Sequence, residues 1–145
     1  MEGERIQYRT KKHLIIFMYP VFWSIFAIYA YAYMHANPIL MPLESLPWLL
    51  ALFLWGYVGL EYQTSEFVVT NKRVMMREGF FFRHSNETRL NAISQVSVNQ
   101  SLLGQMLDYG IVSINAFGAF DAFSTISHPF LFQKTVNEQI DKAVK

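Results

Sequence analysis

The chain has 145 residues, 52% of them hydrophobic and 17% aromatic, and a formal net charge of +1. A nearly neutral chain lacks the basic face that nucleic-acid binding requires, and the absence of cysteine excludes disulfides and thiolate metal sites. The hydrophobic fraction exceeds that of a typical soluble protein, which indicates membrane-spanning segments.

Two apolar stretches dominate the first half of the chain. Residues 14–34 contain no Asp, Glu, Lys, Arg or His, and residues 43–62 carry acidic side chains only near their two ends. About 20 apolar residues are needed to cross a hydrocarbon core of about 30 Å. We therefore predict a transmembrane hairpin with an N-terminal tail over residues 1–63, followed by one domain over residues 64–145.

The cationic residues around these stretches are unevenly distributed. They precede the first stretch or follow the second: Arg5, Arg9, Lys11 and Lys12, then Lys72, Arg73 and Arg77. Cytoplasmic flanks of membrane helices collect Lys and Arg, so both chain ends are expected in the cytoplasm of a bacterial or archaeal cell, beneath its inner membrane. A cleaved signal peptide is the alternative for the first stretch, since Ala30-Tyr31-Ala32 resembles a cleavage site, but that apolar stretch is too long.

The rest of the chain has the pattern of short strands. β-Branched and aromatic residues, alternation with period two and turn signals predict these strands. They cover residues 65–70, 73–78, 93–99, 111–116 and 123–127, with a further return strand beginning at Phe80. Gly79 is expected to form a tight hairpin, because glycine readily adopts positive φ.

Two helices complete the predicted domain. Leu102, Leu103, Met106 and Leu107 have helical spacing and are followed by Gly110. Near the C-terminus Pro129 stands where the first turn of a helix accepts proline. Beyond it, one helical stripe is apolar: Phe132, Val136, Ile140 and Ala143. The predicted fold is a membrane-anchored α+β protein, with a small β-barrel or roll capped by a C-terminal helix.

Several motifs of the predicted domain resemble those of a known family. They are Thr70-Asn71-x-Arg73, then Gly79, then Ile93-x-x-Val96-x-Val98-x-Gln100-Ser101-Leu102, then Leu107-x-Tyr109-Gly110. This order is similar to that of the bacterial pleckstrin-homology-like membrane proteins, in the second bacterial subfamily, where a transmembrane hairpin precedes the domain. The resemblance implies a partly open barrel of about seven strands, capped by the C-terminal helix. It implies a platform for peptides, lipid headgroups or partner proteins, and no particular activity.

Two sets of residues are candidates for binding. The first could face anionic lipid headgroups: Lys72, Arg73, Arg77 and Arg83. The second arises because the domain holds more phenylalanine than the core of so small a barrel needs. An exposed apolar patch marks an interface when it is large. We therefore predict a protein interface formed by Phe81, Phe117, Phe120 and Phe123.

Catalytic motifs are absent from the sequence. It has no Gly-rich phosphate loop, no GxSxG elbow and no HExxH helix, and its four histidines have no ligand spacing. We expect no cofactor, metal or small-molecule substrate. The expected function is a non-catalytic membrane scaffold for protein assembly, in contact with lipids and with a second copy or another membrane protein. The alternatives are an anionic lipid-headgroup binding module and a small subunit of a transport complex.

Overall fold

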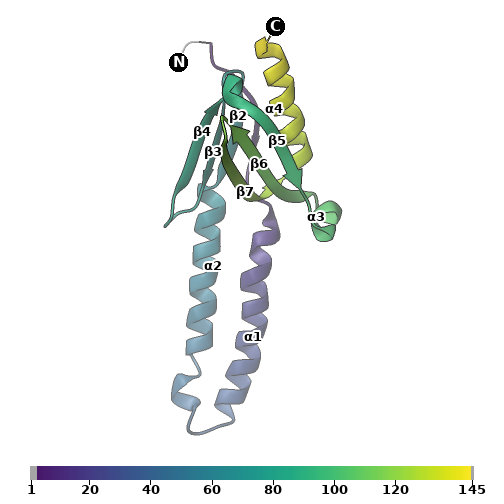
Figure 1. Ribbon diagram of the computed structural model, residues 1–145. Helices are drawn as coiled ribbons and strands as arrows, with labels where there is room; N and C mark the ends of the chain where they lie inside the picture. The colour runs from purple at the N-terminus through teal and green to yellow at the C-terminus, as the bar shows by residue number, and fades with distance from the viewer. Residues whose placement is uncertain (1–2, 145) are drawn as a thin grey trace. The chain divides into compact units, whose positions relative to one another are not determined.

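The computed structural model describes residues 3–144, which divide into two compact units (Figure 1). The helical hairpin comprises Leu14–Tyr62. The β-rich unit comprises residues 3–13 together with residues 63–144. The N-terminal segment is therefore part of the β-rich unit and not, as the sequence predicted, a tail outside the domain.

Two long helices form the hairpin. Helix α1 covers Met18–His35 after the 3₁₀ turn η1 at Leu14–Phe17, and helix α2 covers Leu46–Thr64 after the turn η2 at Met41–Leu43. Both apolar segments are long enough, by length and composition, to cross a membrane. Only 11% and 17% of their most apolar stretches is buried, so neither helix is enclosed within the protein.

Side chains join the two helices to each other. The indole Nε1 of Trp55 on α2 donates a hydrogen bond to Ser24 Oγ on α1, at 3.0 Å. The ring of Phe17 lies 5.9 Å from that of Trp55 and 5.6 Å from that of Tyr62, measured between centroids. These contacts pair the two ends of the hairpin that are nearest to the β-rich unit in the sequence.

Residues 3–144 contain seven strands in two antiparallel sheets, so the predicted α+β class is confirmed, but the barrel is not closed. Sheet A has the order β1-β2-β3-β4, and sheet B has the order β5-β6-β7. The strands of sheet A are β1 (Ile6–Thr10), β2 (Glu66–Thr70), β3 (Arg73–Glu78) and β4 (His84–Arg89). Those of sheet B are β5 (Ile93–Asn99), β6 (Tyr109–Ala116) and β7 (Ala119–Ser127).

Strand β1, which the sequence did not predict, comes from the segment before the hairpin. It pairs with β2, where Thr10 lies opposite Phe67. The chain then passes to sheet B, where the N–H of His13 donates to the carbonyl of Thr125 at 2.7 Å and Lys12 bridges to Ile126. The N-terminal segment thus connects the edges of both sheets.

The position of the hairpin along the chain gives the β-rich unit two distinct ends. The chain leaves this unit after His13 and returns to it at Gln63, beside the start of β2. We call this the hairpin-side end. The turn between β2 and β3, at Asn71 and Lys72, lies at the other end of those strands. We call that the far end.

The core lies between the two sheets and helix α4 (Pro129–Val144). It includes Phe67 and Met76 from sheet A, Val112 and Phe123 from sheet B, and Phe132 from α4. Helix α4 begins at Pro129 as predicted, and its apolar stripe packs on the core as far as Ile140. Burial of this stripe holds the helix on the sheets, because burying one such side chain contributes about 1.5–3 kcal/mol.

The loop after β3 differs from the predicted tight hairpin. Gly79 has the expected positive φ of 85°, yet the return strand begins at His84 and not at Phe80. The carbonyl oxygen of Phe82 would lie 2.3 Å from a Cβ at position 79, so the loop folds back over a residue that must be glycine. A five-residue connection replaces the expected tight turn, and it leaves residues 80–82 outside the sheet.

Candidate functional site

The four basic residues predicted to face lipid lie at opposite ends of sheet A. Lys72 and Arg73 border a cavity of about 500 Å³ at the far end. Arg77 and Arg83 border another, of about 480 Å³, at the hairpin-side end. Arg73 and Arg77 are four residues apart on one strand, which is about 13 Å. The structure therefore does not bring the four together into a single cationic surface.

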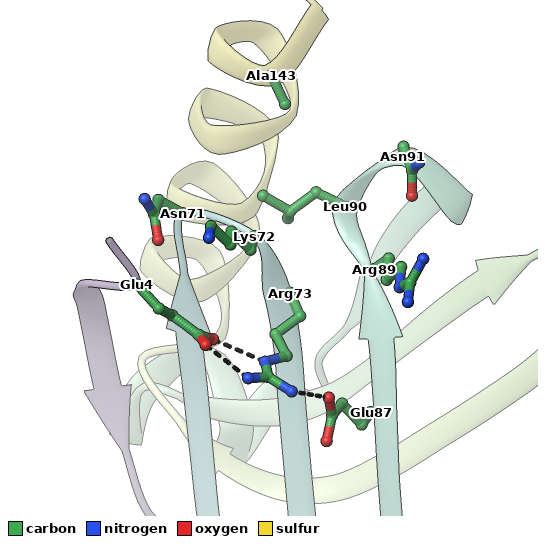
Figure 2. Close-up of a pocket in the computed structure, with 9 residues that line it drawn as sticks. All are labelled: Glu4, Asn71, Lys72, Arg73, Glu87, Arg89, Leu90, Asn91 and Ala143. Atoms are coloured by element: carbon green, nitrogen blue, oxygen red, sulfur yellow. Dashed lines mark hydrogen bonds and ion pairs between the residues drawn. The ribbon is translucent and has the colours of Figure 1, made fainter. Parts of the chain in front are cut away.

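Arg73 is held between two carboxylates (Figure 2). Its Nε donates to Glu4 Oε1 at 2.7 Å and its Nη2 to Glu4 Oε2 at 2.5 Å, which is a bidentate pair. Its Nη1 pairs with Glu87 on β4. Only 21% of the Arg73 side chain and 13% of the Glu4 side chain is exposed. Planar bidentate pairs of this kind are the strong ones, so Arg73 binds the N-terminal segment of its own chain.

The neighbours of Arg73 in the Thr70-Asn71-x-Arg73 motif also hold the N-terminal segment. The Thr70 hydroxyl donates to Glu4 Oε1 at 3.0 Å and accepts the backbone N–H of Arg73 at 3.0 Å. The Asn71 side chain accepts the N–H of Arg5 and donates to the carbonyl of Gly3, both at 3.0 Å. We call Glu4, Thr70, Asn71, Arg73 and Glu87 the N-terminal clasp.

The clasp is expected to be sensitive to pH through Glu4. Hydrogen bonds from Arg73 lower the pKa of the Glu4 carboxyl from its usual 4.5 to about 2. A carboxyl with a lowered pKa contributes full stability above its unfolded pKa, and that contribution is lost as the pH falls through the folded value. Replacing Glu4 with Gln should therefore lower the unfolding midpoint of the β-rich unit near neutral pH. The difference from the wild type should shrink as the pH falls from 4.5 to about 2.

This difference is measured by thermal unfolding of the full chain in detergent, with hydrogen exchange of the β2 amides as the probe of the β-rich unit. Glu138→Gln is the matched control, because Glu138 makes an exposed pair with Lys134 at 3.9 Å. Exposed pairs of this kind contribute little. A Glu4→Gln midpoint that stays parallel to the wild type across that pH range would contradict the clasp.

The cavity at the far end has mixed charge. Three cationic and two anionic side chains line it: Lys72, Arg73, Arg89, Glu4 and Glu87. In Figure 2 the Arg89 side chain points away from the guanidinium of Arg73. An anion in this cavity would meet both carboxylates, so it is a weak candidate for a phosphate site. Among residues 3–144, no group of three or more His, Asp or Glu is placed to hold a metal ion.

The phenylalanines predicted to form an interface divide between surface and core. Phe123 is fully buried, with its ring 5.9 Å from that of Phe67, so its prediction as a surface residue is corrected. Phe81, Phe117 and Phe120 are exposed. Phe117 is 87% exposed and has a φ of 48°, a left-handed conformation that is strained for a bulky residue.

Helix α3 (Leu102–Leu107) has an exposed apolar surface that its sequence did not predict. Its helical spacing is as predicted, but all four of its large apolar side chains are exposed. The helix is held rigidly: Ser101 Oγ accepts the N–H of Gly104, and Gln100 Nε2 donates to the carbonyl of Tyr109 at 3.1 Å. A Cβ at Gly104 would lie 2.5 Å from that carbonyl, which explains the glycine. The residues of the motif from Gln100 to Gly110 therefore hold a short helix in place, and its apolar side chains face outward.

The two antiparallel sheets, capped by a C-terminal helix over one core, define a PH-like domain. Residues 13–142 match the family described as the bacterial PH domain, and this range includes the helical hairpin. The chain therefore belongs to the bacterial PH domain family. No curated protein and no solved structure matches it. Membership places it among modules that interact with proteins or lipids, while the particular ligand has to be argued from its own surface.

Proposed function

We propose that this protein is a non-catalytic scaffold on which partner proteins assemble at the inner face of the cell membrane. The hairpin would anchor it, with both chain ends in the cytoplasm. Support comes from two apolar helices whose most apolar stretches are only 11% and 17% buried. Further support comes from the cationic residues, which flank the hairpin and do not occur within it.

One observation carries the proposal of a partner surface: the conformation of Phe117. It occupies the tip between β6 and β7 with Gly118, and both residues have positive φ. Turns of this type favour Asn-Gly. A bulky side chain there costs about 1 kcal/mol, and Phe117, at 87% exposure, recovers little of that cost through burial. Strain retained without a benefit to folding indicates a binding role.

Phe120, the second residue of β7, is also exposed, at 66%, so two exposed aromatic side chains lie within four residues of each other. Ala116 and Ala119 pair with each other at the base of the tip. We call Phe117, Gly118 and Phe120 the aromatic tip. The aromatic tip lies at the far end. Ala116, at its base, pairs with Ile93, and Leu90, three residues before Ile93, donates its N–H to the carbonyl of Lys72 in the turn at the far end. A partner there would approach from the cytoplasm.

Phe117→Asn should separate folding from binding. It should raise the stability of the β-rich unit by about 1 kcal/mol, because asparagine tolerates the left-handed conformation. It should also reduce binding of a partner, because it removes an exposed aromatic side chain. Hydrogen exchange measures the first effect, and a lower stability than the wild type would contradict the strain argument.

The scaffold itself is tested by gentle detergent extraction from native membranes and native mass measurement. The wild type should be recovered in a defined complex, and Phe117→Asn with Phe120→Ser should be recovered without it. Val144→Ser is the matched control, since Val144 is 82% exposed but lies at the end of α4, outside the aromatic tip. A wild type that is strictly monomeric and free of partners would contradict the proposal.

Binding of anionic lipid headgroups is the second candidate, and the cavity at the hairpin-side end favours it. Arg77 and Arg83 line that cavity together with Gln63, where the chain returns from the hairpin. Glu66 and Glu78 line it too, which weakens its attraction for anions. Charge reversal of both arginines should abolish a preference for anionic over neutral lipids if this candidate is correct. The transport-subunit alternative stays a prediction.

A further inference from the structure

Three exposed apolar segments of the β-rich unit have no role in its core. They are residues 80–82 of the loop after β3, the apolar side chains of α3, and Phe130 with Leu131 in the first turn of α4. We call them the apolar rim. Phe82 is 89% exposed and Met106 is 81% exposed. Together the three segments expose nine large apolar side chains.

All three segments lie at the hairpin-side end of the unit. The loop follows Glu78, whose carboxylate lies 3.3 Å from Nζ of the buried Lys12. Helix α3 is followed by Tyr109, and the ring of His13 stacks on Tyr109 with centroids 5.3 Å apart. Lys12 and His13 are the last residues of the unit before the hairpin, so two of the segments adjoin the point where the chain leaves it.

The third segment adjoins α3. The N–H of His128 donates to the carbonyl of Asp108 at 3.1 Å, directly after α3. A Cβ at Gly110 would meet the ring of Pro129 at 3.3 Å, so α4 starts in close contact with β6. Phe130 is consequently fixed beside the same end of the unit, and it points outward at 57% exposure.

The lipid bilayer fits this surface as its partner. Leu14, the first residue of the first apolar segment, directly follows His13, and Gln63 directly follows Tyr62. One residue extends a chain by at most about 3.6 Å, so an anchored hairpin leaves no linker that could carry this end of the unit away from the membrane. Arg77 and Arg83 at the same end would meet the headgroups.

We propose that the apolar rim inserts into the interfacial layer of the bilayer that the hairpin spans. The rim is then a second attachment, which fixes the orientation of the β-rich unit and directs the aromatic tip toward the cytoplasm. This inference rests on the proposed function, since it requires the hairpin to be in a membrane.

Single-cysteine labelling of the full chain tests the insertion, because the native sequence has no cysteine. Met106→Cys and Phe82→Cys each receive an environment-sensitive fluorophore in nanodiscs of phosphatidylethanolamine and phosphatidylglycerol, with and without spin-labelled lipid as quencher. Asn91→Cys, which is exposed at the far end, is the matched control. Leu52→Cys, exposed on α2, reports on the hairpin itself.

We expect both rim labels to be quenched by the lipid and to shift to the blue, as the Leu52 label does, and the Asn91 label to stay unchanged. Quenching at Leu52 without quenching at Met106 and Phe82 would overturn the inference and leave the anchor intact. An unquenched Leu52 label would instead overturn the anchor, and the inference with it. Rim labels shielded from water but not quenched by lipid would show that a second copy covers the rim, which also overturns it.

Discussion

Replacing Phe123 with alanine should destabilise the β-rich unit by about 3–5 kcal/mol, which is the usual cost of removing a buried phenylalanine. Phe123 is fully buried, and its ring contacts those of Phe67 and His84. The same change at Phe120, on the same strand, should cost less than about 0.5 kcal/mol, because Phe120 is exposed. The two substitutions delete the same atoms, so the difference between them measures burial.

Hydrogen exchange of the β5 and β6 amides in the full chain measures both changes. The three tryptophans, Trp23, Trp48 and Trp55, all lie in the hairpin, so their fluorescence does not report on the β-rich unit. Equal losses of protection for Phe123→Ala and Phe120→Ala would contradict the core that the structure describes.

Deletion of the N-terminal segment is the second change with a large expected effect. A chain that begins at Lys11 lacks β1 and Glu4, so β2 becomes an edge strand and Arg73 loses its bidentate partner. It also lacks Tyr8, whose ring lies 6.3 Å from that of Phe132 in the core. We expect the β-rich unit to lose its resistance to protease while the hairpin remains helical.

Gln7→Ala in the full chain is the control for this deletion, because Gln7 is exposed on β1 and its loss leaves the strand in place. Protease resistance should then match the wild type. A truncated chain that keeps full resistance would show that the β-rich unit folds without β1 and the clasp, and would contradict this prediction.

The sequence predicted those elements whose signal is local. Residues 73–78 and 93–99 are strands as predicted, since turn residues and alternation define them from within. The start of helix α4 is also signalled locally, by Pro129 in its first turn. Strand β1 was missed, because its five residues are mostly exposed and its pairing partner, β2, lies beyond the whole hairpin.

The predicted sites depended on contacts that are distant in the sequence. The pattern around Thr70 and Arg73 predicts a turn, but its partner Glu4 is 69 residues from Arg73. The error at Phe123 arose because the predicted strand began at Phe123, so Phe120 was not placed on the same strand. Strand β7 begins at Ala119, and Phe120 and Phe123, three residues apart on it, face opposite sides. The exposure of α3 had no such signal, because helical spacing alone does not reveal whether an apolar side is covered.

We propose that the hairpin crosses a membrane and holds the β-rich unit on its cytoplasmic side. Membrane-impermeant maleimide applied to intact bacterial cells tests it most directly, with Ile39→Cys between the two helices and Ser94→Cys on β5, both exposed positions. We predict labelling of Ile39→Cys in intact cells and of Ser94→Cys only after lysis. Labelling of Ser94→Cys in intact cells, or of Ile39→Cys only after lysis, would contradict the claim.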